Sequence, residues 1–490
     1  MKTQIVLFFV LLSGFGMAQP NAFVDSVAEA YDRYREPTLE HRRFKHADIL
    51  PLIDALGEDD RVTVHPAGKS VEGRSLSIAE IGEGPTTIFM WTQMHGDEPT
   101  ATRATFDFFN FLLAEDEFDE FRRKLLAETT IYAMIMVNPD GAERFTRRNA
   151  MDIDLNRDAA TLATPEARSL MSAFLEIQPD YAFNLHDQKS RYAAGEKDPA
   201  TQATISFLAP AFNEAKEWNE NRKRATRLIS IMIEALETRI PDGIGKYNDD
   251  YESRAFGDAF QAKGAATILI ESGAHPGDPE REIARRMNFV AYLAAFDAII
   301  DGRVDDYPTD RYDRLPMNDD DLFHLLITGG TARVAKGEFR ADVGVNREER
   351  NYNNATESYV VSEALAVGDL SDERALEVFD ATGMTIEPGA VSEKTISSLE
   401  ELETLDVDSL LRAGVTAVRL EGENVKEGPS PKPITVTLLE RRREPFETAV
   451  KRRADLTIRE NGDVRAVVVN GFVIDFKTGE GAVRNGLIIR

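Results

Sequence analysis

The chain of 490 residues is 42% hydrophobic and carries 58 basic against 85 acidic side chains, a formal net charge of −27. At roughly 100 to 200 residues per domain, this length predicts two or three domains. The acidic balance argues against nucleic acid or anionic lipid as a partner, because such a surface repels phosphates. The absence of cysteine excludes disulfides, thiolate metal sites and cysteine nucleophiles, so any metal must bind to His, Asp or Glu.

The N-terminal segment has the layout of a secretory signal. Lys2 precedes an apolar run from Ile5 to Leu12, and small residues follow up to Ala18. The apolar run is shorter than the roughly 20 residues that a bilayer-spanning helix needs. We therefore predict a signal peptide over residues 1–18 and a secreted or periplasmic mature protein without a membrane span.

Apolar strand-like runs then alternate with amphipathic helical stretches. The strand-like runs are Thr86–Gln93, Thr130–Pro139, Asp180–His186 and Ala266–Ser272, and the helical patterns are Thr100–Ala114, Thr226–Leu236 and Arg281–Ile300. Continuous apolar strands between helices are typical of a buried, mostly parallel sheet with helices on its faces. We therefore predict an α/β domain over residues 25–302.

The composition changes after this domain. Residues 303–321 are rich in Asp and Pro, which predicts a linker. From Leu322 onward, short β-like runs alternate with turn dipeptides such as GG and NG. We therefore expect residues 322–490 to form a smaller, β-rich accessory domain.

Histidines limit where a metal could bind, because the chain has only seven. Two of them, His95 and His186, follow or end strand-like runs, where α/β sheets place their ligand-binding loops. Glu98 follows His95 at a spacing of three, which puts both on one side of the first turn of a helix. Imidazole and carboxylate groups are suitable zinc ligands. The spacing alone, however, is more typical of a surface histidine paired with an acid at a helix N-terminus.

Five ordered motifs between residues 48 and 302 resemble those of the M14 (carboxypeptidase A-like) zinc carboxypeptidases. They are MHGDEPTAT at 94–102, VNPDG at 137–141, RRNAMDIDLNRD at 147–158, FNLHD at 183–187 and TILIESG at 267–273. This resemblance covers about half of the chain. It implies an α/β fold with a mixed, mostly parallel sheet flanked by helices.

The resemblance also implies a metal centre and a reaction. His95, Glu98 and His186 would bind one Zn²⁺ per chain and leave a fourth position open for water. Glu271 would act as the general base for that water. Arg147 would stabilise the negative charge that develops on the scissile oxygen.

The same family resemblance implies residues that bind the substrate. Asn156 and Arg157 would hold the terminal carboxylate, which the planar fork of an arginine matches in a bidentate way. A mobile tyrosine of the family falls on either Tyr247 or Tyr251. The nearby GDAF segment favours Tyr251.

The C-terminal region resembles a different class, the β-sandwich of amidohydrolase-type chains. Segments such as LLITGGTARV at 325–334 and LLRAGVTAVRL at 410–420 are similar to parts of it. The Asp-x-His-x-His metal motif of that class does not follow Pro388, and His324 is the only histidine past residue 275. We therefore expect a sandwich without its barrel, with a structural or binding role.

Together these features predict an exported zinc metallocarboxypeptidase. It would hydrolyse a C-terminal amide bond of a peptide or of a peptidoglycan stem peptide. The alternative is a non-catalytic peptide- or cell-wall-binding protein that retains the cleft. The joint presence of the ligand residues, the glutamate and the arginines favours the enzyme.

Overall fold

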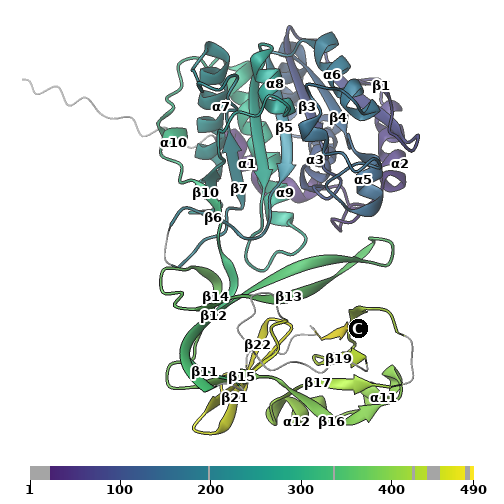
Figure 1. Ribbon diagram of the computed structural model, residues 1–490. Coiled ribbons are helices and arrows are strands. Elements are labelled where there is room, and N and C mark those ends of the chain that lie inside the picture. Colours follow the sequence, from purple (N-terminus) through teal and green to yellow (C-terminus); the bar gives the residue numbers. More distant parts are fainter. Residues whose placement is uncertain are drawn as a thin grey trace, which may run out of the picture.

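The computed structural model describes residues 22–196, 199–334, 337–421, 425–438, 453–479 and 486–489. The predicted signal peptide, residues 1–18, lies outside the described residues. Figure 1 shows two domains, one in which helices surround a sheet and a second one dominated by strands.

An eight-stranded mixed sheet forms the centre of the first domain. In spatial order its strands are β1 (Val62–Lys69), β2 (Ser75–Gly82), β4 (Thr129–Ile135), β3 (Thr86–Thr92), β5 (Tyr181–Asp187), β9 (Ala266–Ser272), β7 (Ile205–Leu208) and β8 (Ile244–Lys246). The central strands β4, β3, β5 and β9 pair in parallel, while β1, β2 and β4 pair antiparallel, as do β9 and β7. The predicted α/β class with a mostly parallel sheet is confirmed.

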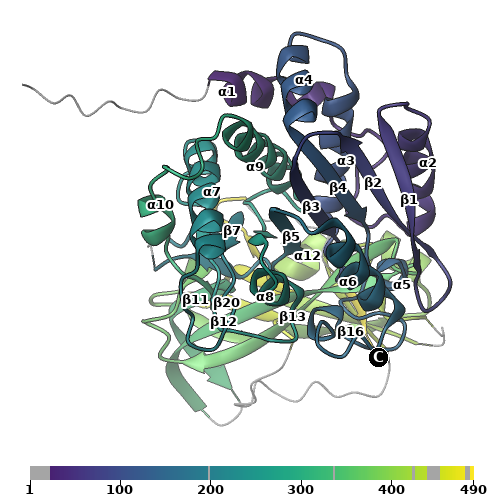
Figure 2. The ribbon, with the colours of Figure 1, turned by 90° about the horizontal axis from the view of Figure 1, so that it is seen from above.

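Helices cover both faces of this sheet, as Figure 2 shows. One core includes residues of α1 (Ala22–Glu29), α2 (His46–Gly57), α3 (Thr100–Leu113), α4 (Asp119–Glu128), α7 (Glu220–Leu236) and α9 (Glu282–Ile300). The other includes residues of α6 (Pro165–Ile177) and α8 (Phe256–Ala262). Successive residues of β3 alternate between them, with Ile88 and Met90 in the first core and Phe89 and Trp91 in the second. This double burial explains the continuous apolar sequence of the central strands.

The structure also differs from the sequence prediction at two boundaries. The strand expected to reach Pro139 ends at Ile135, because Pro139 begins the short helix α5 (Pro139–Arg144), capped by Asn138. Within residues 303–321 lie α10 (Asp310–Asp313) and β10 (Asn318–Asp320), and β10 pairs antiparallel with β6 (Tyr192–Ala194) of the first domain.

The second domain contains two sheets, which confirms its β-rich character. The larger joins β13 (Glu357–Gly368), β12 (Gly337–Tyr352), β11 (Phe323–Val334), β15 (Thr385–Pro388), β20 (Leu456–Glu460), β21 (Asp463–Val469) and β22 (Phe472–Asp475), and β14 (Ala375–Asp380) pairs with β11. The smaller joins β16 (Ala390–Ile396), β17 (Val415–Leu420), β19 (Thr435–Leu438), β23 (Leu487–Ile489) and β18 (Gly428–Pro429), with helices α11 (Leu399–Thr404) and α12 (Val407–Arg412) nearby.

A fully buried ion pair ties the N-terminal segment to the first domain. Arg285 of α9 donates from Nη2 to Asp107 Oδ1 of α3 over 2.5 Å, and both side chains are completely buried. The Tyr31 hydroxyl donates to Asp107 Oδ2 over 2.8 Å, and the backbone N–H of Glu36 donates to Asp107 Oδ1 over 2.7 Å. Asp107 therefore accepts from three donors, two in the N-terminal segment and one in α9.

Replacement of this aspartate should strongly destabilise the first domain. Asp107→Ala leaves the buried Arg285 guanidinium with only the longer contact to Glu282, at 3.6 Å, and removal of one partner of a buried ion pair typically costs about 3 to 5 kcal/mol. The midpoint of urea unfolding, followed by the fluorescence of the two tryptophans, Trp91 and Trp218, measures this loss. The matched control is Asp408→Ala, which removes an exposed pair with Arg412 and should cost no more than about 1 kcal/mol. Equal midpoints for the two variants would contradict the role of Asp107.

Candidate active site

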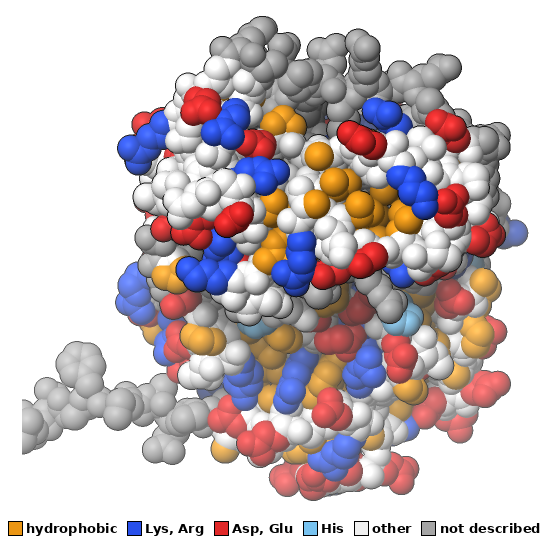
Figure 3. All heavy atoms as spheres, turned by 90° about the horizontal axis from the view of Figure 1, so that it is seen from below, with side chains coloured by type: hydrophobic (Ala, Val, Ile, Leu, Met, Phe, Trp, Pro, Cys, Tyr) orange, Lys and Arg blue, Asp and Glu red, His pale blue; other side chains and the backbone are white. Residues whose placement is uncertain are grey.

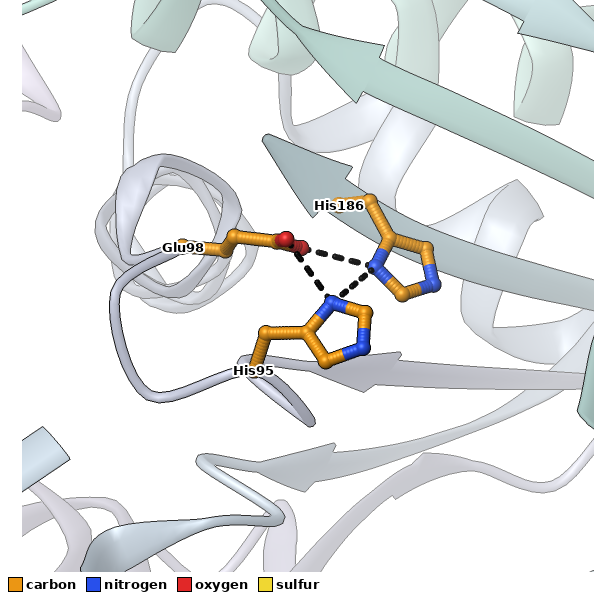
Figure 4. Close-up of side chains that lie close together, drawn as sticks. All are labelled: His95, Glu98 and His186. Carbon is orange, nitrogen blue, oxygen red and sulfur yellow. Dashed lines mark hydrogen bonds and ion pairs between the residues drawn. The ribbon is translucent and has the colours of Figure 1, made fainter. Parts of the chain in front are cut away.

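Three potential metal ligands converge at the carboxyl ends of two neighbouring parallel strands. His95 lies in the loop after β3, Glu98 lies just before α3, and His186 is the second-last residue of β5. His95 Nδ1 lies 2.8 Å from Glu98 Oε1, and His186 Nδ1 lies 2.7 Å from Glu98 Oε2. Figure 4 shows the three side chains pointing toward one another. Two predicted ligand positions far apart in sequence therefore meet in space.

The chemistry of this cluster fits a divalent metal. One ligand atom from each of His95, Glu98 and His186 lies within 4.8 Å of the other two, and all three residues are buried. Burial alone would raise the pKa of Glu98, but the adjacent histidines hold it well below its usual range. Two imidazole nitrogens and a carboxylate oxygen are a donor set that zinc prefers. These residues could hold a zinc ion.

Neighbouring polar groups orient both histidines from behind. Asp154 Oδ1 lies 3.0 Å from His95 Nε2, and Asn156 Nδ2 lies 3.5 Å from His186 Nε2. A carboxylate on the far nitrogen of a ligand histidine fixes the ring and increases its basicity. Asp154 stands two residues before Asn156 in the DIDLNRD segment, but the sequence analysis gave it no role.

The loop that carries His95 requires a glycine. A Cβ atom placed on Gly96 would lie 2.0 Å from the backbone carbon of Gly141 and 2.3 Å from the backbone nitrogen of Ala142. The loop after β3 therefore packs directly against the start of α5. This contact explains why the motifs at 94–102 and 137–141 belong to one local structure.

Glu271 lies beside the cluster, at the end of β9. In the parallel pairing of β5 with β9, Glu271 is the register partner of His186. Burial, followed by the negative charges of Glu98 and Asp187, raises the pKa of Glu271 well above its usual value. A carboxyl group tuned upward in this way is suited to accept and return a proton near neutral pH.

Two arginines predicted from the sequence lie at the same cleft. Arg147 donates from Nε to Asp154 Oδ2 over 3.0 Å and from Nη1 to Glu98 Oε1 over 3.2 Å. Arg157 donates to the backbone carbonyl of Asn156 over 2.7 Å and pairs with Glu252 at 3.4 Å. Both arginine side chains are nearly half exposed, so a ligand in the cleft can reach them.

Of the two candidate tyrosines, Tyr247 is the one that lines the cleft. The charge of Glu271 is the largest cause that raises the pKa of the Tyr247 hydroxyl. Tyr251, which the sequence favoured, lies outside the lining of this cleft. The two tyrosines lie four residues apart in an irregular segment between β8 and α8. Without a regular repeat, the sequence does not predict which hydroxyl faces the site.

Arg281 is a residue of the site that the sequence analysis missed. Its side chain is mostly buried, and its backbone adopts a left-handed conformation, with φ of 56°, at the start of α9. Its guanidinium donates to the backbone carbonyls of Ser272 over 2.7 Å and Gln188 over 2.8 Å. Arg281 therefore joins the loops that follow β9 and β5, and no local motif marks this role.

One cleft with a volume of about 830 Å³ is lined by His95, Glu98, Arg147, Asn156, Arg157, His186, Tyr247, Glu271 and Arg281. This volume falls within the roughly 300 to 1,000 Å³ of small-molecule sites. Its wall includes residues of the first domain and residues of β12 and β13 in the second.

Comparisons with known proteins agree with this geometry. Residues 49–214 match the family model of the zinc carboxypeptidases, Peptidase_M14. Carboxypeptidase 2 of Trichophyton rubrum is 29% identical over 160 residues, which cover 30% of this chain and 29% of that protein. Carboxypeptidase SOL1 of Arabidopsis thaliana is 27% identical over 139 residues, 25% of this chain and 28% of that protein. These matches support the M14 zinc carboxypeptidase family, whose members are zinc-dependent, and they span less than a third of the relatives' length.

Among solved structures, a metallo-carboxypeptidase from Burkholderia cenocepacia is similar, with a TM-score of 0.44 and 18% sequence identity. The comparison covers 53% of this chain and 70% of that chain.

The metal centre predicts that zinc retention depends on His186. We expect His186→Ala to lose zinc on dialysis against metal-free buffer, because a carboxylate and one imidazole remain as ligands. Zinc analysis of the dialysed protein by atomic absorption measures the loss. His65→Ala is the matched control, since His65 lies in β1 and pairs with Glu80 away from the cluster. Equal zinc contents in the two variants would refute the assignment.

Proposed function

We propose that the protein is a zinc metallocarboxypeptidase, which binds one zinc ion per chain through His95, Glu98 and His186. The observation that supports this most strongly is the convergence of these three side chains with Glu271 at the ends of adjacent strands. The same cleft is lined by Arg147 and Arg157. The alternative of a non-catalytic binding protein is less favoured, because such a protein has no need for a buried carboxyl group with a raised pKa beside the ligands.

The residues of this chain would divide the chemical work. Zinc, when bound, supplies Lewis-acid polarisation of the scissile carbonyl and of water. Glu271 accepts a proton from the attacking water and delivers it to the leaving amine. Arg147, held by Asp154, presents its guanidinium to the charge that develops on the carbonyl oxygen.

Other residues would bind and orient the substrate. Arg157 and Asn156 would hold the terminal carboxylate, and Tyr247 would contribute a hydroxyl in place of Tyr251. The partly exposed guanidinium of Arg157 supports this role. Free peptides and peptidoglycan stem peptides both present a carboxylate of this kind, so either class fits the proposal.

Export is part of the proposal and depends on the pattern of residues 1–18. Within the described residues, no helix combines the length and the apolar character that a membrane crossing requires. The likeness of residues 322–490 to the amidohydrolase β-sandwich likewise stays a proposal. Their role would be structural or in substrate binding.

The general base gives the first functional prediction. Glu271→Gln keeps the size of the side chain but removes its basicity, so kcat should fall by roughly 10² to 10⁴. Zinc content should stay unchanged. Release of the C-terminal amino acid from a short peptide measures kcat, with Glu220→Gln, an exposed residue of α7, as the matched control. A variant as active as the control would exclude Glu271 as the base.

The carboxylate site gives the second prediction. Amidation of the substrate C-terminus, or Arg157→Ala, removes a charge-assisted hydrogen bond that contributes about 1.5 to 3 kcal/mol. Either change should therefore lower kcat/KM at least about tenfold, and both together should cost little more than one, because they delete a single interaction.

The matched control for this cycle is Arg148→Ala. Arg148 is the exposed neighbour of Arg147 and pairs with Asp152. This variant should prefer the free acid over the amide as strongly as the intact protein does. Equal hydrolysis of free-acid and amidated peptides by the intact protein would exclude a carboxypeptidase.

A further inference from the structure

A two-stranded arm of the second domain reaches over the first domain. The arm consists of β12 and β13, residues 337–368. The pairing of β12 with β11 ends at Val345, whereas its pairing with β13 continues to Tyr352. At about 3.4 Å per residue, these seven further residues extend the arm by roughly 24 Å beyond the sheet. Figure 1 shows the arm crossing between the two domains.

A partly exposed carboxylate on the arm, Glu349, anchors the arm to the first domain through two mostly buried arginines. Glu349 of β12 lies 3.1 Å from Arg42 Nη2 and 3.0 Å from Arg43 Nη2. Both arginine side chains are mostly buried, at 14% and 8% exposed. Burial opposes ionisation of Glu349, but the two arginines hold its pKa down, at about 2. Glu349 is therefore ionised at neutral pH and forms ion pairs with both arginines.

Further contacts fix the outer end of the arm. The Asn351 side chain donates from Nδ2 to the backbone carbonyl of Arg144 over 2.7 Å, and its Oδ1 accepts from Arg43 over 2.8 Å. Lys45 Nζ donates to the carbonyl of Asn354 over 2.8 Å. The Arg43 guanidinium stacks over the Phe145 ring, 3.9 Å from its centre. These contacts hold the arm at the segment between α5 and Arg147.

The docked arm forms part of the cleft that contains the metal ligands and Glu271. Asn346, Glu348, Arg350, Glu363 and Leu365 of the arm line this cleft. Figure 3, seen from the side of the second domain, shows the atoms of that domain in front of part of the first domain. The approach to the metal ligands is therefore bounded by the arm on one side.

Resting on the proposed carboxypeptidase activity, we propose that the arm is the second wall of the substrate cleft. It selects C-termini of short or unstructured peptides and excludes C-termini that emerge directly from a folded protein. A flexible chain can thread between the arm and the first domain. A folded body close to the scissile bond collides with the arm, which its ion pairs and hydrogen bonds hold in place.

Two substrates with the same C-terminal sequence test this selection on the zinc-loaded protein. One is a free hexapeptide, and the other is the same six residues fused without a linker to a small folded carrier. We expect kcat/KM for the hexapeptide to exceed that for the fusion at least about thirtyfold. A ratio within about threefold would overturn the proposal.

Variants that release the arm should reduce this preference. Glu349→Ala removes the ion pair from the side of the arm, and Arg43→Ala removes it from the side of the first domain. If one variant does not fold, the other still tests the proposal. Each should raise kcat/KM for the fusion about tenfold or more and leave the hexapeptide value within about threefold. Glu338→Ala is the matched control, because Glu338 of the arm pairs with Arg333 inside the second domain. An unchanged preference in both released variants would overturn the proposal.

Binding separates the role of the arm from the proposed reaction. Anisotropy of a fluorescent label on the two substrates, with the zinc-loaded Glu271→Gln variant, gives their Kd values without turnover. If the hexapeptide binds more tightly than the fusion, and if the added Glu349→Ala change removes this difference, the role of the arm is supported. This holds even if the intact protein cleaves neither substrate, a result that would contradict only the proposed carboxypeptidase activity. Equal Kd values for both substrates would reject the arm as a selective wall.

Discussion

The parallel register between β5 and β9 determines the geometry of the site. It places His186 directly beside Glu271, so that a ligand and the proposed base come from adjacent strands. Both strands are fully buried; Phe183 and Leu185 of β5 lie in the first core and Ala182 in the second, while Ile268 and Ile270 of β9 lie in the first. A shift of one residue would turn every side chain of a strand to the opposite face of the sheet. Packing of the apolar residues therefore fixes the distance between the polar groups at the ends of these strands.

Much of the first domain follows from local sequence pattern. The apolar runs of β3, β5 and β9 and the HxxE spacing of His95 and Glu98 are properties of short segments, and the structure has all three strands where they were expected. Asp154 and Arg281 act through partners far away in the chain, such as His95 and Gln188. Their roles depend on tertiary placement, and a single sequence holds no signal for it.

The association of the two domains shows the same limit more clearly. Arg42 and Glu349 stand 307 residues apart, and each is an ordinary charged residue in a chain with 29% charged residues. Only the folded arrangement brings them together as an ion pair between the two domains, with the arginine side chain mostly buried. The two domains resemble two different families, and neither resemblance contains information on how the domains contact each other. That the second domain borders the cleft of the first could therefore not be predicted.

The connection between the domains is itself part of a sheet. β10 pairs residue by residue with β6 of the first domain, and Tyr312, shortly before it, is buried in the first core. A protease that cut the exposed bonds near residue 303 would therefore leave the two fragments joined by strand pairing and by the arm. The molecule should consequently behave as one cooperative body, which could not be divided into two modules for separate expression without exposing apolar surface on the first.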